Sequence, residues 1–179
     1  SKPERLSTKG IIKVILSDPC VRYMFAYRLA SSYNKMHFYG FFSRVWLHFL
    51  KPKFNIQIYL RANIGKGFKL NHYGNIIINQ GVKIGENCNV AQGVTIGNIS
   101  RGKLKGCPTI GDRVWIGPNA VVVGKINIGN DVLIAPLTYV NIDLPDGAVV
   151  SGNPCEIHNY NGSGVYVKNV YEPQNYSKI

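Results

Sequence analysis

Aliphatic residues recur at every sixth position through most of this chain. They form two series, Ile78, Ile84, Val90 and Ile96, followed by Ile110, Ile116, Val122, Ile128, Ile134 and Val140. A period of six matches neither an α-helix, which repeats every 3.6 residues, nor a half-buried strand, which alternates every second residue. It must therefore belong to a larger repeated unit. The chain is predicted to be a solenoid, in which stacked coils bury one continuous core.

The residues around each aliphatic position predict a short strand followed by a turn. Glycine often follows the aliphatic, as in Ile64-Gly65, Ile84-Gly85, Ile96-Gly97, Ile110-Gly111, Ile116-Gly117 and Ile128-Gly129. Such a glycine suits a tight turn that needs freedom in φ and close approach of the backbone. Four positions after the aliphatic we expect a second inward residue, namely Cys88, Val94, Val114, Ala120, Val132 or Thr138.

The repeat changes phase twice, and both places are candidates for functional loops. The step from Leu70 to Ile78 is eight residues, which places two extra residues near Asn71 and His72. The step from Ile96 to Ile110 is fourteen, and the extra residues fall in a basic segment, 98–108. Insertions in a solenoid form loops on one face, which is often the binding face.

The segment before the solenoid has helical spacing and many aromatic side chains. Two helices are predicted, over about 19–34 and about 38–50, and Pro52 is expected to end the helical part. We therefore divide the chain into a helical segment, 1–53, a β-helical domain, 54–157, and a C-terminal tail, 158–179, to which the sequence assigns no role.

Charge is concentrated in the helical segment, where ten Lys and Arg residues stand against Glu4 and Asp18. Two interpretations of this segment remain open. We favour the one in which its aromatics cap the open end of the β-helix and pack between subunits. The alternative is a peripheral contact with an anionic membrane.

The whole-chain charge of +12 would also suit nucleic acid or a phosphorylated ligand. No helix-turn-helix, aromatic RNA-binding motif or zinc pattern accompanies it, so nucleic acid is not an expected partner.

The cysteines show neither CxxC nor metal-ligand spacing, which is typical of reduced thiols; they are Cys20, Cys88, Cys107 and Cys155. The apolar run 11–16 is short and contains Lys13, so we expect no signal peptide and a cytoplasmic protein, with any membrane contact at the inner face.

Three stretches, 64–72, 94–97 and 145–154, resemble the hexapeptide-repeat acyltransferase superfamily, as does 18–30 more weakly. The most similar branch contains serine O-acetyltransferases and the colanic-acid and capsular-polysaccharide O-acetyltransferases. The resemblance implies a mainly β fold, a left-handed parallel β-helix with a short N-terminal α-helical segment. It also implies acetyl-CoA as co-substrate without a metal, and a homotrimer with active sites between subunits.

By this resemblance His72 is the general base, although a solvated turn histidine is the simpler interpretation of the residue alone. The serine acetyltransferase pattern has an Asp where this chain has Asn71, a second Asp at Gln57, and Arg-His-Pro at 106–108, where Cys107 replaces the histidine. The missing arginine disfavours an acceptor that carries a carboxylate. Cys107 itself would act as a nucleophile only with a nearby base or a lowered pKa, which the sequence does not show.

The leading hypothesis is therefore acetyl transfer from acetyl-CoA to a sugar hydroxyl of a surface or capsular polysaccharide or its precursor, with His72 as base. The alternatives are serine O-acetyltransfer for cysteine biosynthesis and a non-catalytic β-helical assembly module. Candidate acceptor-binding residues are Asn71, Gln92 and Cys107. The resemblance nominates for the CoA groove Gly97, Asn98, Gly117 and Ala135, with Lys103, Lys105 and Lys125 for its phosphates. For each lysine, a solvated surface charge is the simpler explanation.

Overall fold

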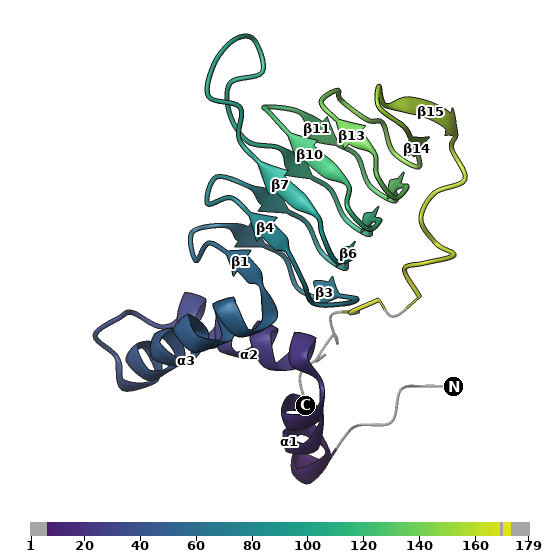
Figure 1. Ribbon diagram of the computed structural model, residues 1–179. Coiled ribbons are helices and arrows are strands. Elements are labelled where there is room, and N and C mark those ends of the chain that lie inside the picture. Colours follow the sequence, from purple (N-terminus) through teal and green to yellow (C-terminus); the bar gives the residue numbers. More distant parts are fainter. Residues whose placement is uncertain (1–6, 169, 173–179) are drawn as a thin grey trace, which may run out of the picture.

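A computed structural model describes residues 7–168 and 170–172, and it shows a left-handed parallel β-helix with three helices at one end (Figure 1). The helices are α1 Thr8–Ser17, α2 Pro19–Ser32 and α3 Phe38–Phe54. The strands are β1 Ile56–Ile58, β2 Asn63–Ile64, β3 Lys69–Leu70, β4 Ile76–Ile78, β5 Lys83–Ile84, β6 Asn89–Val90, β7 Thr95–Gly97, β8 Thr109–Ile110, β9 Trp115–Ile116, β10 Val121–Val123, β11 Asn127–Ile128, β12 Leu133–Ile134, β13 Tyr139–Val140, β14 Val149–Ser151 and β15 Glu156–Asn159.

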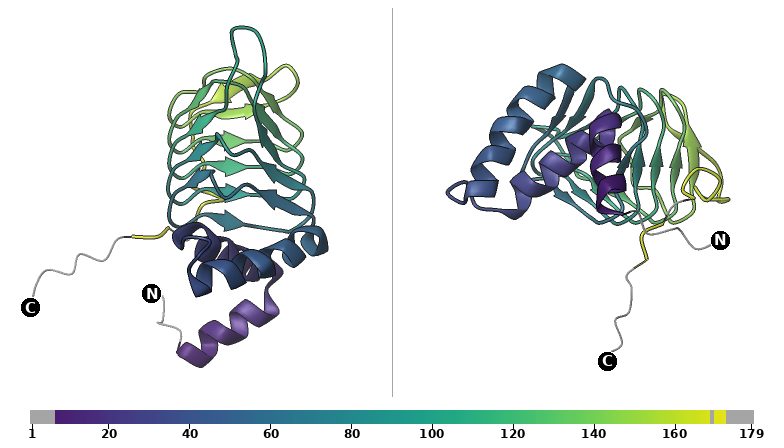
Figure 2. Two further views of the ribbon diagram at one scale, coloured as in Figure 1. Left: turned by 90° about the vertical axis from the view of Figure 1, so that its left-hand side faces the viewer. Right: turned by 90° about the horizontal axis from the view of Figure 1, so that it is seen from below.

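Successive strands take turns among three sheets, so that one coil crosses each sheet once. Sheet A has the order β1-β4-β7-β10-β13, sheet B the order β2-β5-β8-β11, and sheet C the order β3-β6-β9-β12-β14-β15. Neighbouring strands are parallel except for β15, which pairs with β14 in the antiparallel direction. Each sheet is therefore one side of a prism, and the turns between strands stack into three corners (Figure 2).

The six-residue series forms the core, as predicted. Ile78, Ile96 and Val122 stand in register on neighbouring strands of sheet A, and all three are completely buried. The second inward set is also buried, with exposed fractions of 0–1% from Cys88 to Thr138. Burial of an aliphatic side chain contributes about 1.5–3 kcal/mol, so stacking supplies what a single coil lacks.

Apart from Gly97, the glycines after the aliphatic residues serve close packing between coils, and none of them has a positive φ, which corrects one part of the prediction. Positive φ is confined to other positions, and it does not occur at Gly65, Gly85 or Gly111. A Cβ at Gly85 would lie 2.6 Å from the carbonyl oxygen of Gly111 in the next coil. The short distance between neighbouring coils therefore leaves no room for a side chain at this turn position.

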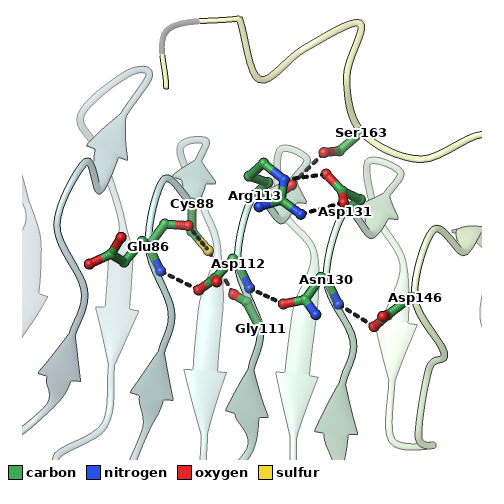
Figure 3. Close-up of polar contacts among 9 residues, drawn as sticks. All are labelled: Glu86, Cys88, Gly111, Asp112, Arg113, Asn130, Asp131, Asp146 and Ser163. Atoms are coloured by element: carbon green, nitrogen blue, oxygen red, sulfur yellow. Dashed lines mark hydrogen bonds and ion pairs between the residues drawn. The ribbon is translucent and has the colours of Figure 1, made fainter. Parts of the chain in front are cut away.

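Side chains of one corner tie the coils together between sheets B and C (Figure 3). The Glu86 amide donates to Asp112 Oδ1 at 2.7 Å, the Asp112 amide to Asn130 Oδ1 at 2.8 Å, and the Asn130 amide to Asp146 Oδ1 at 2.7 Å. The side chains of Asp112, Asn130 and Asp146 thus each accept a hydrogen bond from a backbone N–H of the coil before. These bonds satisfy backbone N–H groups that the sheets leave unpaired.

Helix α2 closes the open end of the β-helix. The hydroxyl of buried Tyr23 accepts a hydrogen bond from the Ile58 amide at 3.2 Å, and the Tyr27 hydroxyl donates to the Ala62 carbonyl at 3.1 Å. Arg28 donates to the carbonyl oxygen of Ile64 at 2.6 Å. An uncovered first coil would present unpaired backbone groups, and these side chains satisfy several of them. The capping part of the interpretation is confirmed for Tyr23 and Tyr27, whereas packing between subunits stays a prediction.

The helical segment differs from prediction at both ends. The run that contains Lys13 forms α1, which the sequence did not suggest; Ser7 caps it by accepting from the Gly10 amide at 3.2 Å. Helix α3 continues through Pro52 to Phe54. Pro52 sits in the last turn, where it costs one hydrogen bond without breaking a longer helix, and Asn55 then ends the helix in the left-handed conformation.

The described part of the tail runs back along sheet C toward the helices, as Figure 1 shows in yellow. The Ser163 hydroxyl donates to the carbonyl of Arg113, and the Tyr166 ring stacks on Trp115 with centroids 4.3 Å apart. Near its end, the Asn87 side-chain amide donates to the carbonyl of Tyr171 at 3.2 Å. The tail is a strap over sheet C; 173–179 and the first six residues of the chain lie outside the described residues.

Candidate functional site

His72 lies at the corner where strands of sheet C turn toward sheet A, which we call the C–A corner. In successive coils this corner carries Asn71 and His72 after β3, Gln92 after β6, Gly117 after β9 and Ala135 after β12. The two-residue phase change after Leu70 therefore falls in the coil nearest the helices. His72 is exposed there, with two pockets beside it.

One pocket of about 410 Å³ lies on the sheet C side of His72. It is lined by Lys69, Asn71, His72, Ala91, Gln92, Trp115, Pro118 and Tyr166. The strap supplies Tyr166, whose ring rests on the nearly buried Trp115. This pocket joins an imidazole, a lysine, an amide and an aromatic wall.

Gln92, which lines this pocket, has an unsatisfied side-chain oxygen. Its Oε1 is buried and has no hydrogen-bond partner among the described residues. A buried acceptor without a donor costs about 1–3 kcal/mol, so a native structure normally supplies a donor from a ligand or water. Gln92 is thus suited to accept a hydrogen bond from a hydroxyl, an ammonium or an amide N–H.

A second pocket of about 310 Å³ lies on the helical side of His72. Its lining residues are Ser17, Asp18, Pro19, Cys20, Asn71, His72 and Tyr73. Asp18 caps α2, because its Oδ1 accepts from the Cys20 amide at 2.8 Å and from the Val21 amide at 3.1 Å. A carboxylate fixed by helix capping therefore faces the same cavity as His72, one side of which α2 supplies.

The basic insertion 98–108 forms a hairpin at a different corner, between sheets A and B (Figure 1). The amide of Ile99 donates to the carbonyl of Gly106 at 3.0 Å, and the reverse bond is 2.9 Å long. The Lys125 amide donates to the Leu104 carbonyl at 2.9 Å, so the hairpin bends over the next coil. Lys103, Lys105 and Lys125 are all exposed in this region.

Cys107 closes the hairpin and contacts the coil below it, where its Sγ lies 3.5 Å from Asn79 Oδ1. Burial raises the pKa of the Cys107 thiol, with a smaller opposing effect from the Gly81 backbone. A raised pKa keeps the thiol protonated near neutrality, which disfavours it as a nucleophile.

The structure thus places the predicted site residues in two groups, at two different corners of the β-helix. Within one protomer the two groups do not share a pocket. The C–A corner holds Asn71, His72, Gln92, Gly117 and Ala135. The hairpin corner holds Gly97, Asn98, Lys103, Lys105, Cys107 and Lys125. Neither pocket at His72 includes a residue of the hairpin.

Sequence reasoning missed Asp18, Lys69, Trp115 and Tyr166 as neighbours of His72. Two of them had a usable signal, because Lys69 aligns with Asn89, and Asn89 with Trp115, on adjacent strands of sheet C. Counting two coils forward from Lys69, on the strand before His72, would have found Trp115. For Tyr166 the sequence held no such signal, because this residue lies in a tail without a repeat.

Within the residues that the structure describes, no three His, Cys, Asp or Glu side chains gather in a way that would hold a metal ion. The same residues contain no helix that is both long and apolar enough to cross a bilayer.

Comparisons with known proteins identify the family in which this architecture occurs. The family model "Bacterial transferase hexapeptide (six repeats)" matches residues 107–141. The serine acetyltransferase of Helicobacter pylori strain ATCC 700392 / 26695 is 34% identical over 141 residues, which cover 79% of this chain and 82% of that protein.

Solved structures agree on the fold. A Brucella abortus serine acetyltransferase in complex with coenzyme A is 23% identical with a TM-score of 0.71, over 85% of this chain and 66% of that one. A Neisseria gonorrhoeae serine acetyltransferase in complex with serine is 25% identical with a TM-score of 0.68, over 88% of this chain and 63% of that one. This chain therefore belongs to the hexapeptide-repeat acyltransferase family, in the branch that contains the serine acetyltransferases.

Proposed function

We propose that this chain, an acetyl-CoA-dependent acyltransferase, transfers the acetyl group to the hydroxyl of L-serine with His72 as general base. The observation that carries the proposal is the position of His72 between two pockets, one with the unpartnered Gln92 oxygen and one with the Asp18 carboxylate. The similarity to serine acetyltransferases supports serine over the sugar acceptor that the sequence favoured.

The chemistry requires a base because an alcohol is a weak nucleophile near neutral pH. When bound, acetyl-CoA supplies an acetyl group activated as a thioester. The His72 imidazole takes the proton from the acceptor hydroxyl as the oxygen bonds to the acetyl carbon. It then gives that proton to the departing sulfur, so that the imidazole is regenerated. An exposed imidazole at the mouth of both pockets is placed for this exchange.

The charged groups near His72 match the charges of serine. Asp18 lines one pocket and would attract the ammonium group, while Lys69 lines the other and would attract the carboxylate. Lys69 substitutes in charge for the arginine that the serine acetyltransferase pattern places near 106, although without its bidentate geometry. Gln92 would accept a hydrogen bond from the substrate through its buried oxygen.

The hairpin corner has the charges that CoA requires. Lys103, Lys105 and Lys125 are exposed, and the one ion pair among the described residues lies elsewhere, between Arg113 and Asp131. These lysines would attract the phosphates of CoA. The glycine and small side chains at the C–A corner, Gly117 and Ala135, would let the pantetheine arm approach the backbone.

Joining the two corners requires a second subunit. A head-to-tail contact that closes at three copies would bring the hairpin of one protomer to the C–A corner of the next. The proposal therefore includes a homotrimer in which each site takes His72 from one protomer and lysines from its neighbour.

A sugar hydroxyl is the second candidate acceptor, and two observations favour it. No arginine lines either pocket at His72, and the stacked Trp115 and Tyr166 rings form a wall of the kind on which a sugar ring packs. A neutral sugar would also need neither Asp18 nor Lys69.

Release of CoA thiol from acetyl-CoA distinguishes the two acceptors. The purified chain is offered L-serine or a panel of hexoses and N-acetylhexosamines at equal concentrations. We expect thiol release with L-serine, and its KM should rise in Asp18→Asn, which keeps the helix cap but removes the charge. Faster release with a sugar, unaffected by Asp18→Asn, would replace serine by the second candidate.

A further inference from the structure

Helix α3 has two apolar faces, and only one of them belongs to the core. Its inner face carries Gly40, Ser43, Leu47, Leu50 and Phe54, which are buried. Its outer face carries five apolar side chains with exposed fractions of 67%, 56%, 53%, 41% and 65%; they are Phe38, Phe41, Phe42, Val45 and Phe49. We call these five residues the outer stripe.

The outer stripe is continuous. Its members are spaced i, i+3, i+4, i+7 and i+11, which places them along one side of a helix. The rings touch one another, with centroids 4.5 Å apart for Phe38 and Phe42 and 5.5 Å apart for Phe41 and Phe42. Scattered exposed apolar residues need no explanation, whereas four phenylalanines along one side of a helix, three of them in ring contact, indicate a binding surface.

The β-helix does not use the outer stripe. The aromatics that cap its open end are Tyr23, Tyr27 and Phe54, which are at most 6% exposed. Figure 2 shows α3 at the end of the prism, beneath the first coil. The capping role therefore accounts for the inner face alone.

The helical segment that carries the outer stripe has a strong excess of positive charge. Between residues 7 and 54, eight Lys and Arg side chains stand against Asp18 alone, a net charge of +7, and neither α1 nor α3 contains an acidic residue. The arginines donate to carbonyl oxygens, as Arg44 does to Tyr33 at 3.0 Å and Arg22 to Ile15 at 3.1 Å. Carbonyls do not neutralise a guanidinium, so this positive charge is left without a counter-charge on the described residues.

We propose that the outer stripe docks on an anionic lipid surface, with Phe side chains in the headgroup region and the surrounding cations against lipid phosphates. Phenylalanine beside Lys and Arg on an amphipathic helix is the combination that binds such interfaces. A second copy of this chain that met the outer stripe with its own stripe is a poorer occupant, because it would bring two faces of like charge together.

Helix α1, which packs on α2 at the same end of the molecule, exposes further apolar and basic side chains. None of its residues is buried, and it exposes Ile11, Ile12 and Leu16 by 47%, 53% and 64%, together with the cations Lys9 and Lys13. Docking would also place the acceptor site near the lipid, since His72 follows β3 in the coil that α3 leads into. The inference does not depend on which acceptor is used.

Vesicle sedimentation tests the proposal with the full chain. Sucrose-loaded phosphatidylcholine vesicles are prepared with or without about 30% phosphatidylglycerol. We expect binding to the anionic vesicles only, and weaker binding as NaCl rises from about 0.05 to about 0.5 M. The double variant Phe41→Ser with Phe49→Ser should lower the partition coefficient at least about tenfold. Thiol release with a soluble acceptor and the circular dichroism spectrum should stay unchanged.

A matched control removes two exposed apolar residues at the other end of the prism, Leu137→Ser with Ile142→Ser, and should bind vesicles as the wild type does. Equal binding of both double variants, or equal binding to neutral and anionic vesicles, would overturn the proposal. So would a drop in the sedimentation mass of the Phe variant without lipid, because the outer stripe would then lie between copies of this chain.

Discussion

At the scale of single residues, a buried aliphatic in each strand and a glycine in most of the turns determine how closely the coils stack. Ile78, Ile96 and Val122 are buried in register as the period of six implies, because one aliphatic per strand is what a stacked core requires. The positions of the turn glycines were predicted correctly. Of the two reasons given for them, close approach of the backbone was right and freedom in φ was wrong. Contact between coils is a three-dimensional property, and a sequence does not report the distance between Gly85 and Gly111.

Gly85→Ala tests the packing explanation. The new Cβ would lie 2.6 Å from the Gly111 oxygen and 2.7 Å from its carbonyl carbon, and these backbone atoms have no freedom to move aside. We expect a loss of about 1–3 kcal/mol in the free energy of unfolding, measured by urea denaturation. Gly97 occupies the same position in its hexad with its nearest neighbour 3.6 Å away, so Gly97→Ala should cost little. Equal losses would refute the explanation.

At the scale of elements, the strands could be predicted from the six-residue repeat, whereas the ends of the helices and the C-terminal strap could not. Helix α1 was missed because its apolar run, 11–16, is only six residues long and Lys13 interrupts it, which is too little to establish a helical period. The C-terminal strap has no periodicity, and it is held by single contacts such as the Tyr166 stack on Trp115. Contacts between residues 51 positions apart in a non-repeating segment leave no signal in one sequence.

The strap is expected to shape the acceptor pocket. Tyr166→Ala removes an aromatic wall beside His72 without touching the core, so the KM of the acceptor should rise by roughly fivefold with kcat little changed. Tyr160→Ala, which removes an exposed aromatic of the same tail outside both pockets, is the control. Steady-state kinetics in which both variants match the wild type would exclude Tyr166 from the site.

At the scale of the whole molecule, the fold came from the sequence repeat and the family resemblance, but the division of the site between two corners did not. Phase changes at His72 and at the hairpin pointed to loops, and nothing in a linear repeat states which corner each loop occupies. In the homotrimer proposed above, the two halves meet through a neighbouring subunit, so the active unit is predicted to be larger than one chain of 19.9 kDa.

Mixed assemblies test the shared site. His72→Ala and the hairpin variant Lys103→Glu with Lys105→Glu are each expected to be inactive alone. Random mixing pairs a native His72 corner with a native hairpin in about a quarter of the contacts of a head-to-tail ring. Co-expression with two affinity tags should therefore recover about a quarter of wild-type activity. Assemblies that contain both variants and stay inactive would place each site within one protomer.

The most direct test of the central claim, that His72 is the base of an acetyl transfer, is the rate of CoA thiol release from acetyl-CoA with the acceptor present. His72→Ala should lower kcat by at least about a hundredfold with an unchanged circular dichroism spectrum, because the loss of a general base costs this much. His48→Ala, which removes an exposed histidine of α3, should leave the rate unchanged. A folded His72→Ala protein that releases thiol at the wild-type rate would contradict the account.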